Sequence, residues 1–166
     1  MRTQDVLLRR PDHLLARWNE ILVWVGSGSV DDEILVEVRR CLKAIAEEHP
    51  GGAALLMVAR GQQELPKLEM RRTIVRGLAS LGERLQGVAA VFEGEPRWVG
   101  AARLVLDRML AVTPGAFPLR VLVDREEAIL WLGEIVVGPE GRPIDIIELA
   151  PFVEEAVASA TRNSVD

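Results

Sequence analysis

The side chains that most often carry out chemistry are few in this chain and are scattered along it. The two histidines, His13 and His49, are far apart, and the one cysteine, Cys41, lies in the apolar stripe of a predicted helix. A metal site or a Cys–His pair needs such groups to converge, and their spacing shows no such pattern. We therefore expect no enzyme, no cofactor and no bound metal. Cys41 is interpreted as a small apolar core residue, and His49 as a residue at a helix end, where a positive charge is favoured.

A glycine-rich segment, Gly26-Ser27-Gly28-Ser29, stands between a predicted strand and a predicted helix. Glycine permits close backbone approach and a helix N-terminus favours negative charge, so such a segment can hold an anion. It lacks the spacing and the lysine of a P-loop and the full glycine fingerprint of a dinucleotide fold. We interpret it as a turn followed by a helix cap, in which Ser29 and Asp32 satisfy free N–H groups.

A second group of candidate residues is expected on loops and helix starts that follow the strands. Trp98 comes after the loop at residues 94–97, and tryptophan and arginine are both enriched where proteins contact one another. Trp98 either lines a cleft beyond the strand that ends near Phe92 or begins the buried face of a helix, and the periodicity favours the helix. The candidate interaction surface comprises Arg60, Gln62, Gln63, Glu64, Arg71, Glu95, Arg97 and Trp98.

The composition describes one apolar-rich, acidic domain. The chain has 166 residues, 49% of them apolar, and 20 Lys and Arg against 25 Asp and Glu give a net charge of −5. This allows a core without disulfides or metals, and an acidic surface repels phosphate backbones, so no nucleic acid partner is expected. One cysteine excludes an intramolecular disulfide and favours the cytoplasm. No segment approaches the roughly 18 apolar residues of a membrane span, so we expect a soluble, unprocessed chain with no membrane partner.

The candidate residues are positioned by elements arranged around one apolar run, residues 53–59. This run has no alternation, so it predicts a central strand buried on both faces. The segments before and after it have the periodicity of amphipathic helices, each with one apolar stripe. A strand buried on both faces between such helices predicts a small α/β layer fold.

The other elements follow from periodicity and turn residues. Residues 13–20 and 21–25 are predicted to form an opening hairpin with Asn19 at its turn. The first helix is expected from the Ser29 cap to about Glu48. The remaining predictions, in order, are a helix beginning at Pro66, a strand at 88–92, a helix after Pro96, a strand at 118–123 and a short helix capped by Asp124.

Residues 134–166 are predicted to be an extension of a domain that ends at residue 133. Residues 134–137 and 144–147 flank a turn at 138–141 and are expected to form a hairpin, and residues 150–160 an extra helix. The apolar residues of this segment are too numerous for a disordered linker. They either pack on the chain's own domain or form an interface with another copy. We slightly favour the second, a homo-oligomer.

Several features together resemble the STAS or SpoIIAA-like family, which includes anti-sigma-factor antagonists and the cytoplasmic domains of anion transporters. They are the opening hairpin, the helix start at residues 29–33, the apolar strand at 53–59 and the closing stretch at 119–132 with its Glu-Glu-Ala and Trp-Leu pairs. The resemblance covers residues 10–133 and is strongest to divergent bacterial STAS-like proteins. It implies a small mixed sheet flanked by helices.

One departure from the family pattern concerns phosphorylation. Members that act as phosphoswitches carry a serine just after the central strand, where a phosphate changes partner docking. Residues 60–66 of this chain contain no Ser, Thr or Tyr, and Thr73 lies well inside the next helix. We therefore do not expect a phosphoswitch at this loop.

Three functions remain open at this point. The leading hypothesis, from the resemblance and the missing catalytic groups, is a non-catalytic bacterial regulatory protein that binds another protein or self-associates. The second is a small-ligand carrier or an enzyme with its site at the carboxyl ends of the strands, lined by residues 26–29, 60–66 and 92–97. The third is a structural subunit of an assembly.

Overall fold

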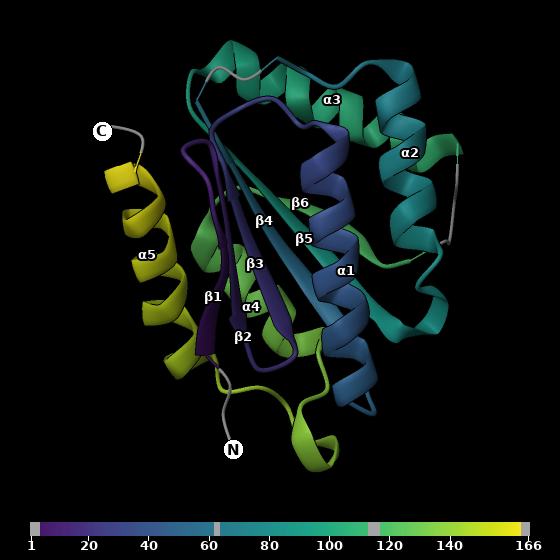
Figure 1. Ribbon diagram of the computed structural model, residues 1–166, viewed down its shortest axis with the longest axis vertical. Helices are drawn as coiled ribbons and strands as arrows, with labels where there is room; N and C mark the ends of the chain where they lie inside the picture. The colour runs from purple at the N-terminus through teal and green to yellow at the C-terminus, as the bar shows by residue number, and fades with distance from the viewer. Residues whose placement is uncertain (1–3, 62–63, 113–116, 164–166) are drawn as a thin grey trace.

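The computed structural model describes residues 4–61, 64–112 and 117–163. In these residues one six-stranded sheet is flanked by five α-helices (Figure 1). The strands are β1 (Gln4–Arg9), β2 (His13–Trp18), β3 (Ile21–Gly26), β4 (Ala53–Arg60), β5 (Leu85–Glu93) and β6 (Leu119–Leu122). The helices are α1 (Asp32–Glu48), α2 (Leu68–Ala79), α3 (Pro96–Val112), α4 (Arg125–Ile135) and α5 (Ile146–Asn163), with short 3-10 turns at Gly82–Arg84 and Pro139–Gly141.

The strands lie in the sheet in the same order as in the sequence, from β1 to β6. β1, β2 and β3 pair antiparallel, whereas β3, β4, β5 and β6 run parallel. Parallel neighbours need a crossover connection, and α1, α2 and α3 supply the three that are required. The predicted α/β fold, a small mixed sheet flanked by helices, is confirmed.

The predicted central strand is also confirmed. β4 lies between β3 and β5, with Leu56 opposite Val23 on one side and Ala89 on the other. Its side chains alternate between two separate cores, so both faces must be apolar. Ala54, Leu56 and Val58 face one core, and Leu55 and Met57 face the other.

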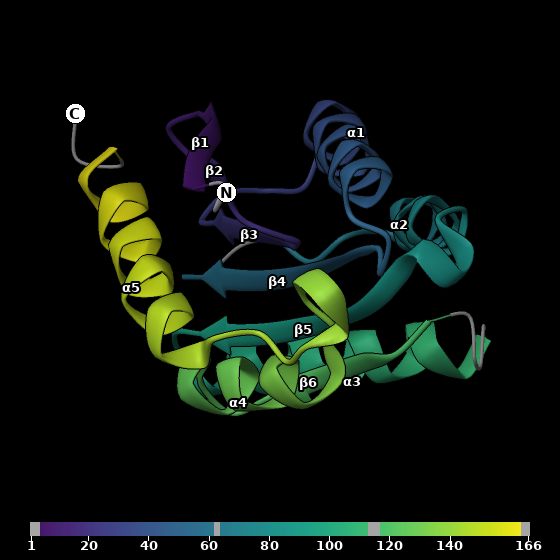
Figure 2. The same ribbon diagram turned by 90° about the horizontal axis from the view of Figure 1, so that it is seen from below.

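The two faces of the sheet are covered by different helices, which Figure 2 shows on opposite sides. α4 and α5 cover the face that carries Leu56. α1 packs on the other face through the predicted stripe, of which Ile34, Val38, Cys41, Leu42 and Ile45 are buried. The interpretation of Cys41 as a core residue is confirmed.

Two predicted helix starts are wrong. Ser29 does not cap α1, because the cap is Asp31, whose carboxylate accepts a 2.8 Å hydrogen bond from the backbone N–H of Ile34. α2 begins at Leu68, two residues after Pro66, and has no side-chain cap. The cap at Asp124 is confirmed, since it accepts a 2.9 Å bond from the N–H of Glu127.

The predicted C-terminal hairpin is wrong as well. α4 continues to Ile135, past the domain boundary drawn at residue 133, and the connector that follows contains only an isolated bridge between Val137 and Pro143. Ile146 and Ile147 already belong to α5, a helix longer than predicted. Leu149 and Val153 of this helix are fully buried against the sheet, so the tail completes the core of its own domain.

One strand was not predicted. β1 forms the edge of the sheet beside β2, and most of its side chains are exposed. None of the helices in the described ranges combines the length and the hydropathy that a membrane span requires.

Candidate functional site

The side chains on the sheet face that carries α1 leave a hollow beside the packed core. A cavity of about 580 Å³, here called the main cavity, lies between this face and helices α1, α2 and α3. Its floor is apolar and comes from four strands: Trp24, Leu55, Met57, Val88, Ala90 and Leu119. Its walls are apolar too, with Leu35 and Val38 from α1, Ile74 and Leu78 from α2, and Leu106 and Met109 from α3. This size falls in the range of about 300–1,000 Å³ that small-molecule sites occupy.

A second cavity of about 100 Å³, the strand-end cavity, adjoins the first at the carboxyl ends of the parallel strands. The two share five lining residues, Trp24, Met57, Ile74, Leu106 and Met109. The strand-end cavity also touches Gly26, Ala59 and Phe92, at or next to the last residues of β3, β4 and β5. The apolar space therefore reaches the edge of the sheet where open α/β folds place ligands.

α2 forms a wall of the main cavity and packs only at the margin of the core. None of its side chains is fully buried, although its apolar stripe faces the sheet. Ile74, Val75 and Leu78 are half-buried and line the cavity, and Leu78 also packs against the core on this face of the sheet. The apolar stripe of this amphipathic helix therefore faces both the edge of the core and the cavity.

The indole nitrogen of Trp24, a residue on the floor of the main cavity, already has a hydrogen-bond partner. Nε1 of Trp24 donates a 3.2 Å hydrogen bond to Nδ1 of His13, whose side chain is completely buried. An indole nitrogen can only donate, so Nδ1 accepts and the ring proton of His13 lies on Nε2. That nitrogen lies 3.1 Å from the carbonyl oxygen of Ser29. His13 thus has a structural role, and the apolar part of the indole remains free to contact a ligand.

The structure describes six of the eight residues of the candidate interaction surface. Glu64 and Trp98 line the strand-end cavity, where Trp98 packs edge-to-face on Phe92 with 5.8 Å between ring centroids. Arg71 donates a 2.7 Å hydrogen bond to the carbonyl of Pro66. Glu95 and Arg97 are exposed at the start of α3. Gln62 and Gln63 lie outside the described residues.

Arg60 belongs to a polar cleft on the other side of the strand ends. It pairs at 3.2 Å with Glu93, which also pairs at 2.9 Å with Arg125. Arg60 also hydrogen-bonds the hydroxyl of Thr161 at the end of α5. The charges of this cleft are thus largely satisfied by partners within the chain.

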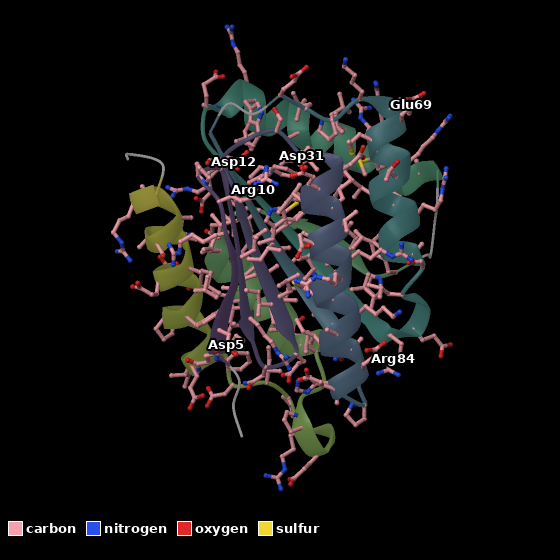
Figure 3. The ribbon with its side chains drawn as sticks, in the orientation of Figure 1. Asp5, Arg10, Asp12, Asp31, Glu69 and Arg84 are labelled. Atoms are coloured by element: carbon pink, nitrogen blue, oxygen red, sulfur yellow. The ribbon has the colours of Figure 1, made fainter. Side chains whose placement is uncertain are left out.

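The glycine-rich segment packs against acidic side chains rather than an anion site. Gly28 approaches Asp12 so closely that a Cβ would lie 2.6 Å from the Asp12 Cβ. Asp12 and Asp31 lie together with Arg10 at this end of the sheet (Figure 3), and Arg10 pairs with Asp31 at 3.0 Å. The hydrogen bond from Arg10 holds the pKa of Asp31 below its ordinary value. The interpretation of this segment as a turn agrees with this arrangement.

A buried titratable cluster lies at the opposite end of the sheet and was not predicted. Glu20 is 1% exposed, and neither carboxyl oxygen has a hydrogen-bond partner among the described residues. Burial raises the pKa of Glu20 above its ordinary value. His49 Nδ1 lies 3.7 Å from Glu20, and Arg17 donates a 3.0 Å hydrogen bond to His49 Nε2.

His49 is the C-cap residue of α1, so it lies at the helix end as interpreted from the sequence, but its surroundings do not favour a positive charge. Burial and then the charge of Arg17 lower its pKa below the ordinary value, because a second positive charge beside the guanidinium is disfavoured. Within the described part of the chain, no three His, Cys, Asp or Glu side chains are grouped so as to hold a metal ion.

The comparisons with known proteins concern the fold. No protein-family model matches the chain, and no curated protein matches it. Among solved structures, the chain is similar to an uncharacterized protein of the DUF3478 family with a SpoIIAA-like fold from Shewanella loihica PV-4. The two are 15% identical, the match covers 80% of this chain and 95% of the other, and the TM-score is 0.45. The architecture of the present chain rests on its own strand order and two helical layers.

Proposed function

We propose that this protein binds a small apolar molecule, or the alkyl chain of a larger one, between its sheet and helices α1, α2 and α3. The observation that carries the proposal is the main cavity, which is about 580 Å³ in volume and has an apolar floor and apolar walls. The strand-end cavity extends it toward the carboxyl ends of the strands. Filling an apolar space with hydrocarbon is favourable because apolar surface leaves water and new dispersion contacts form.

Binding of this kind has a measurable dependence on chain length. Each buried methylene contributes about 0.8 kcal/mol, which is roughly a fourfold change in Kd. We expect linear alcohols of increasing length to displace an apolar fluorescent dye with affinities that rise by about this factor, until the cavity is filled. Absence of saturable dye and alcohol binding would contradict the proposal.

A cavity-filling variant tests where the ligand lies. Ala90 of β5 is a small residue on the cavity floor, so Ala90→Leu places extra side-chain volume inside it. We expect this variant to bind long alcohols more weakly while it keeps its fold, checked by circular dichroism. Ala158→Leu, on the exposed face of α5, is the matched control and should bind as the parent does.

Regulation through a protein partner and self-association stay predictions, as does the absence of catalysis. One feature links a partner to the cavity. α2 lines the cavity with Ile74 and Leu78 and also carries Arg71, a residue of the candidate interaction surface. A ligand and a partner protein would thus contact the same helix.

A further inference from the structure

We infer that the molecule bound in the main cavity is a single-chain amphiphile with an anionic head, held by Arg39 of α1 and Arg76 of α2. This inference rests on the proposed function and names the class of its ligand. The chemistry that recognises the head is a guanidinium binding a carboxylate or a phosphate monoester, the two anionic groups that its planar donors match best.

The mouth of the main cavity is identified by exposure. Most residues that line the cavity are buried or half-buried, but six are exposed, and all six come from α1 or from α2 and its C-cap. They are Asp32, Val36, Arg39, Thr73, Arg76 and Ser80. The cavity therefore opens between these two helices. A chain that enters it would leave its polar end among these six side chains.

Within the described ranges, the guanidinium groups of the two arginines at this mouth have no partner. Neither the guanidinium of Arg39 nor that of Arg76 makes a hydrogen bond or an ion pair with another described residue. The neighbouring Arg40 differs, because its guanidinium is 2.7 Å from the carboxylate of Glu37. In a chain with a net charge of −5, two unpaired arginines beside an apolar opening favour an anion at that place.

The one acidic residue of the mouth lies apart from Arg39. Asp32 is in the first turn of α1, seven residues before Arg39, which is about 10 Å along the helix axis. Thr73 of α2 and Ser80, the C-cap of α2, lie on either side of Arg76, but each hydroxyl already donates its one proton to a backbone carbonyl, that of Glu69 or Gly77. The two guanidinium groups are therefore the donors that this mouth offers to an anionic oxygen. The arrangement thus favours an anionic head near Arg39 and Arg76, with its chain on the floor that includes Trp24 and Met57.

The test compares ligands with the same ten-carbon chain and different heads. Decanoate, decyl phosphate, decanol and decylamine are titrated against the dye-loaded full-length protein below their micelle concentrations. We expect both anions to bind more tightly than decanol, and decylamine to bind most weakly. Each of Arg39→Gln and Arg76→Gln should weaken binding of the anions by about two- to fivefold and leave decanol unchanged. The double variant should remove the preference, and added salt should reduce it.

Control variants remove one positive charge elsewhere on the same helices. Arg40→Gln on α1 and Arg72→Gln on α2 do not line the cavity and should leave every affinity unchanged. Equal affinity for decanoate and decanol would overturn the inference of an anionic head group. An anion preference that survives in the double variant would overturn it too. Neither result would contradict the proposed binding of an alkyl chain in the main cavity. Failure of all four ligands to bind overturns the proposed function. A preference for one anion over the other distinguishes a fatty acid from a phosphate ester.

Discussion

Trp24 of β3 and His13 of β2 form a buried hydrogen-bonded pair, with 3.2 Å between Nε1 and Nδ1 and 5.9 Å between ring centroids. The bond crosses from one antiparallel strand to the next at the wall of the strand-end cavity. It allows a large side chain with a polar atom to stand on the floor of an apolar cavity. The shape of the candidate site depends on this pair.

The first prediction removes the acceptor of that bond. His13→Leu leaves the indole N–H of Trp24 buried without a partner, and we expect unfolding free energy to fall by about 2 kcal/mol. Denaturant unfolding measures it. The double variant with Trp24→Phe removes the donor as well, so its loss should be smaller than the sum of the two single losses. Additive losses would show that the two side chains do not depend on each other.

Much of the fold could be predicted because its signals are local. Residues 53–59 form β4 as expected, since a continuous apolar run is stable only where both faces are covered. The stripe of α1 and the cap at Asp124 were predicted for similar reasons. Each of these patterns can be read within a single helix, strand or helix cap.

Other features depend on contacts that are distant in sequence. β1 combines charged and apolar residues without alternation and forms because β2 offers an open edge. Residues 134–147 contain many β-branched residues, which favour strands, yet Ile135 and Ile146 are helical and half-buried against the core. Tertiary packing here outweighs the local preference.

The candidate site was predicted only in part. One hypothesis from the sequence was a ligand site lined by the loops that follow β3, β4 and β5. The strand-end cavity borders Gly26, Glu64 and Trp98, which lie in or next to these loops. The main cavity was missed because the stripe of α2 has the same pattern whether it covers side chains or empty space. Glu20 was missed because a lone glutamate at a turn gives no sign of burial.

The second prediction concerns the tail. Leu149 of α5 is completely buried against the sheet. Leu149→Ala should lower the unfolding free energy by roughly 3 kcal/mol, the usual cost of such a cavity. Ile147→Ala on the same helix is the control and should change little, because Ile147 is 83% exposed. Equal small effects would mean that α5 does not pack on its own domain.

A related experiment decides the role of residues 134–166 in assembly. A chain cut after residue 133 loses α5 and exposes the apolar face that includes Ala16, Val23 and Leu56. We expect it to aggregate or unfold. A folded, monomeric truncated chain, together with an oligomeric full-length protein, would instead support the interface between copies that the sequence favoured.

The third prediction concerns pH. The pKa of Glu20 is raised above its ordinary value of 4.5, first by burial, so the folded state holds this proton more tightly than the unfolded state. Its contribution is fully present below pH 4.5 and is lost as pH rises through the folded-state pKa. Glu20→Gln cannot titrate, so its stability relative to the parent should increase with pH above about 4.5.

His49 supplies the control, because its linkage has the opposite sign. Its folded-state pKa lies below the ordinary 6.5, so stability falls as pH drops from 6.5 toward the folded-state pKa. His49→Gln should remove that dependence and keep the one from Glu20. If the difference in unfolding free energy between Glu20→Gln and the parent is the same at every pH from 4 to 8, the buried carboxyl does not titrate abnormally.

The most direct measurement of the central claim uses the four tryptophans. Trp24 and Trp98 line the apolar cavities, whereas Trp18 and Trp131 belong to the core on the opposite face. An alkyl ligand that carries bromine quenches tryptophan fluorescence by contact. In the variant with Trp18→Phe and Trp131→Phe, we expect saturable quenching of the remaining tryptophans. In the variant with Trp24→Phe and Trp98→Phe, we expect none. Equal quenching in both variants, or none in the first, would contradict ligand binding between the sheet and α1, α2 and α3.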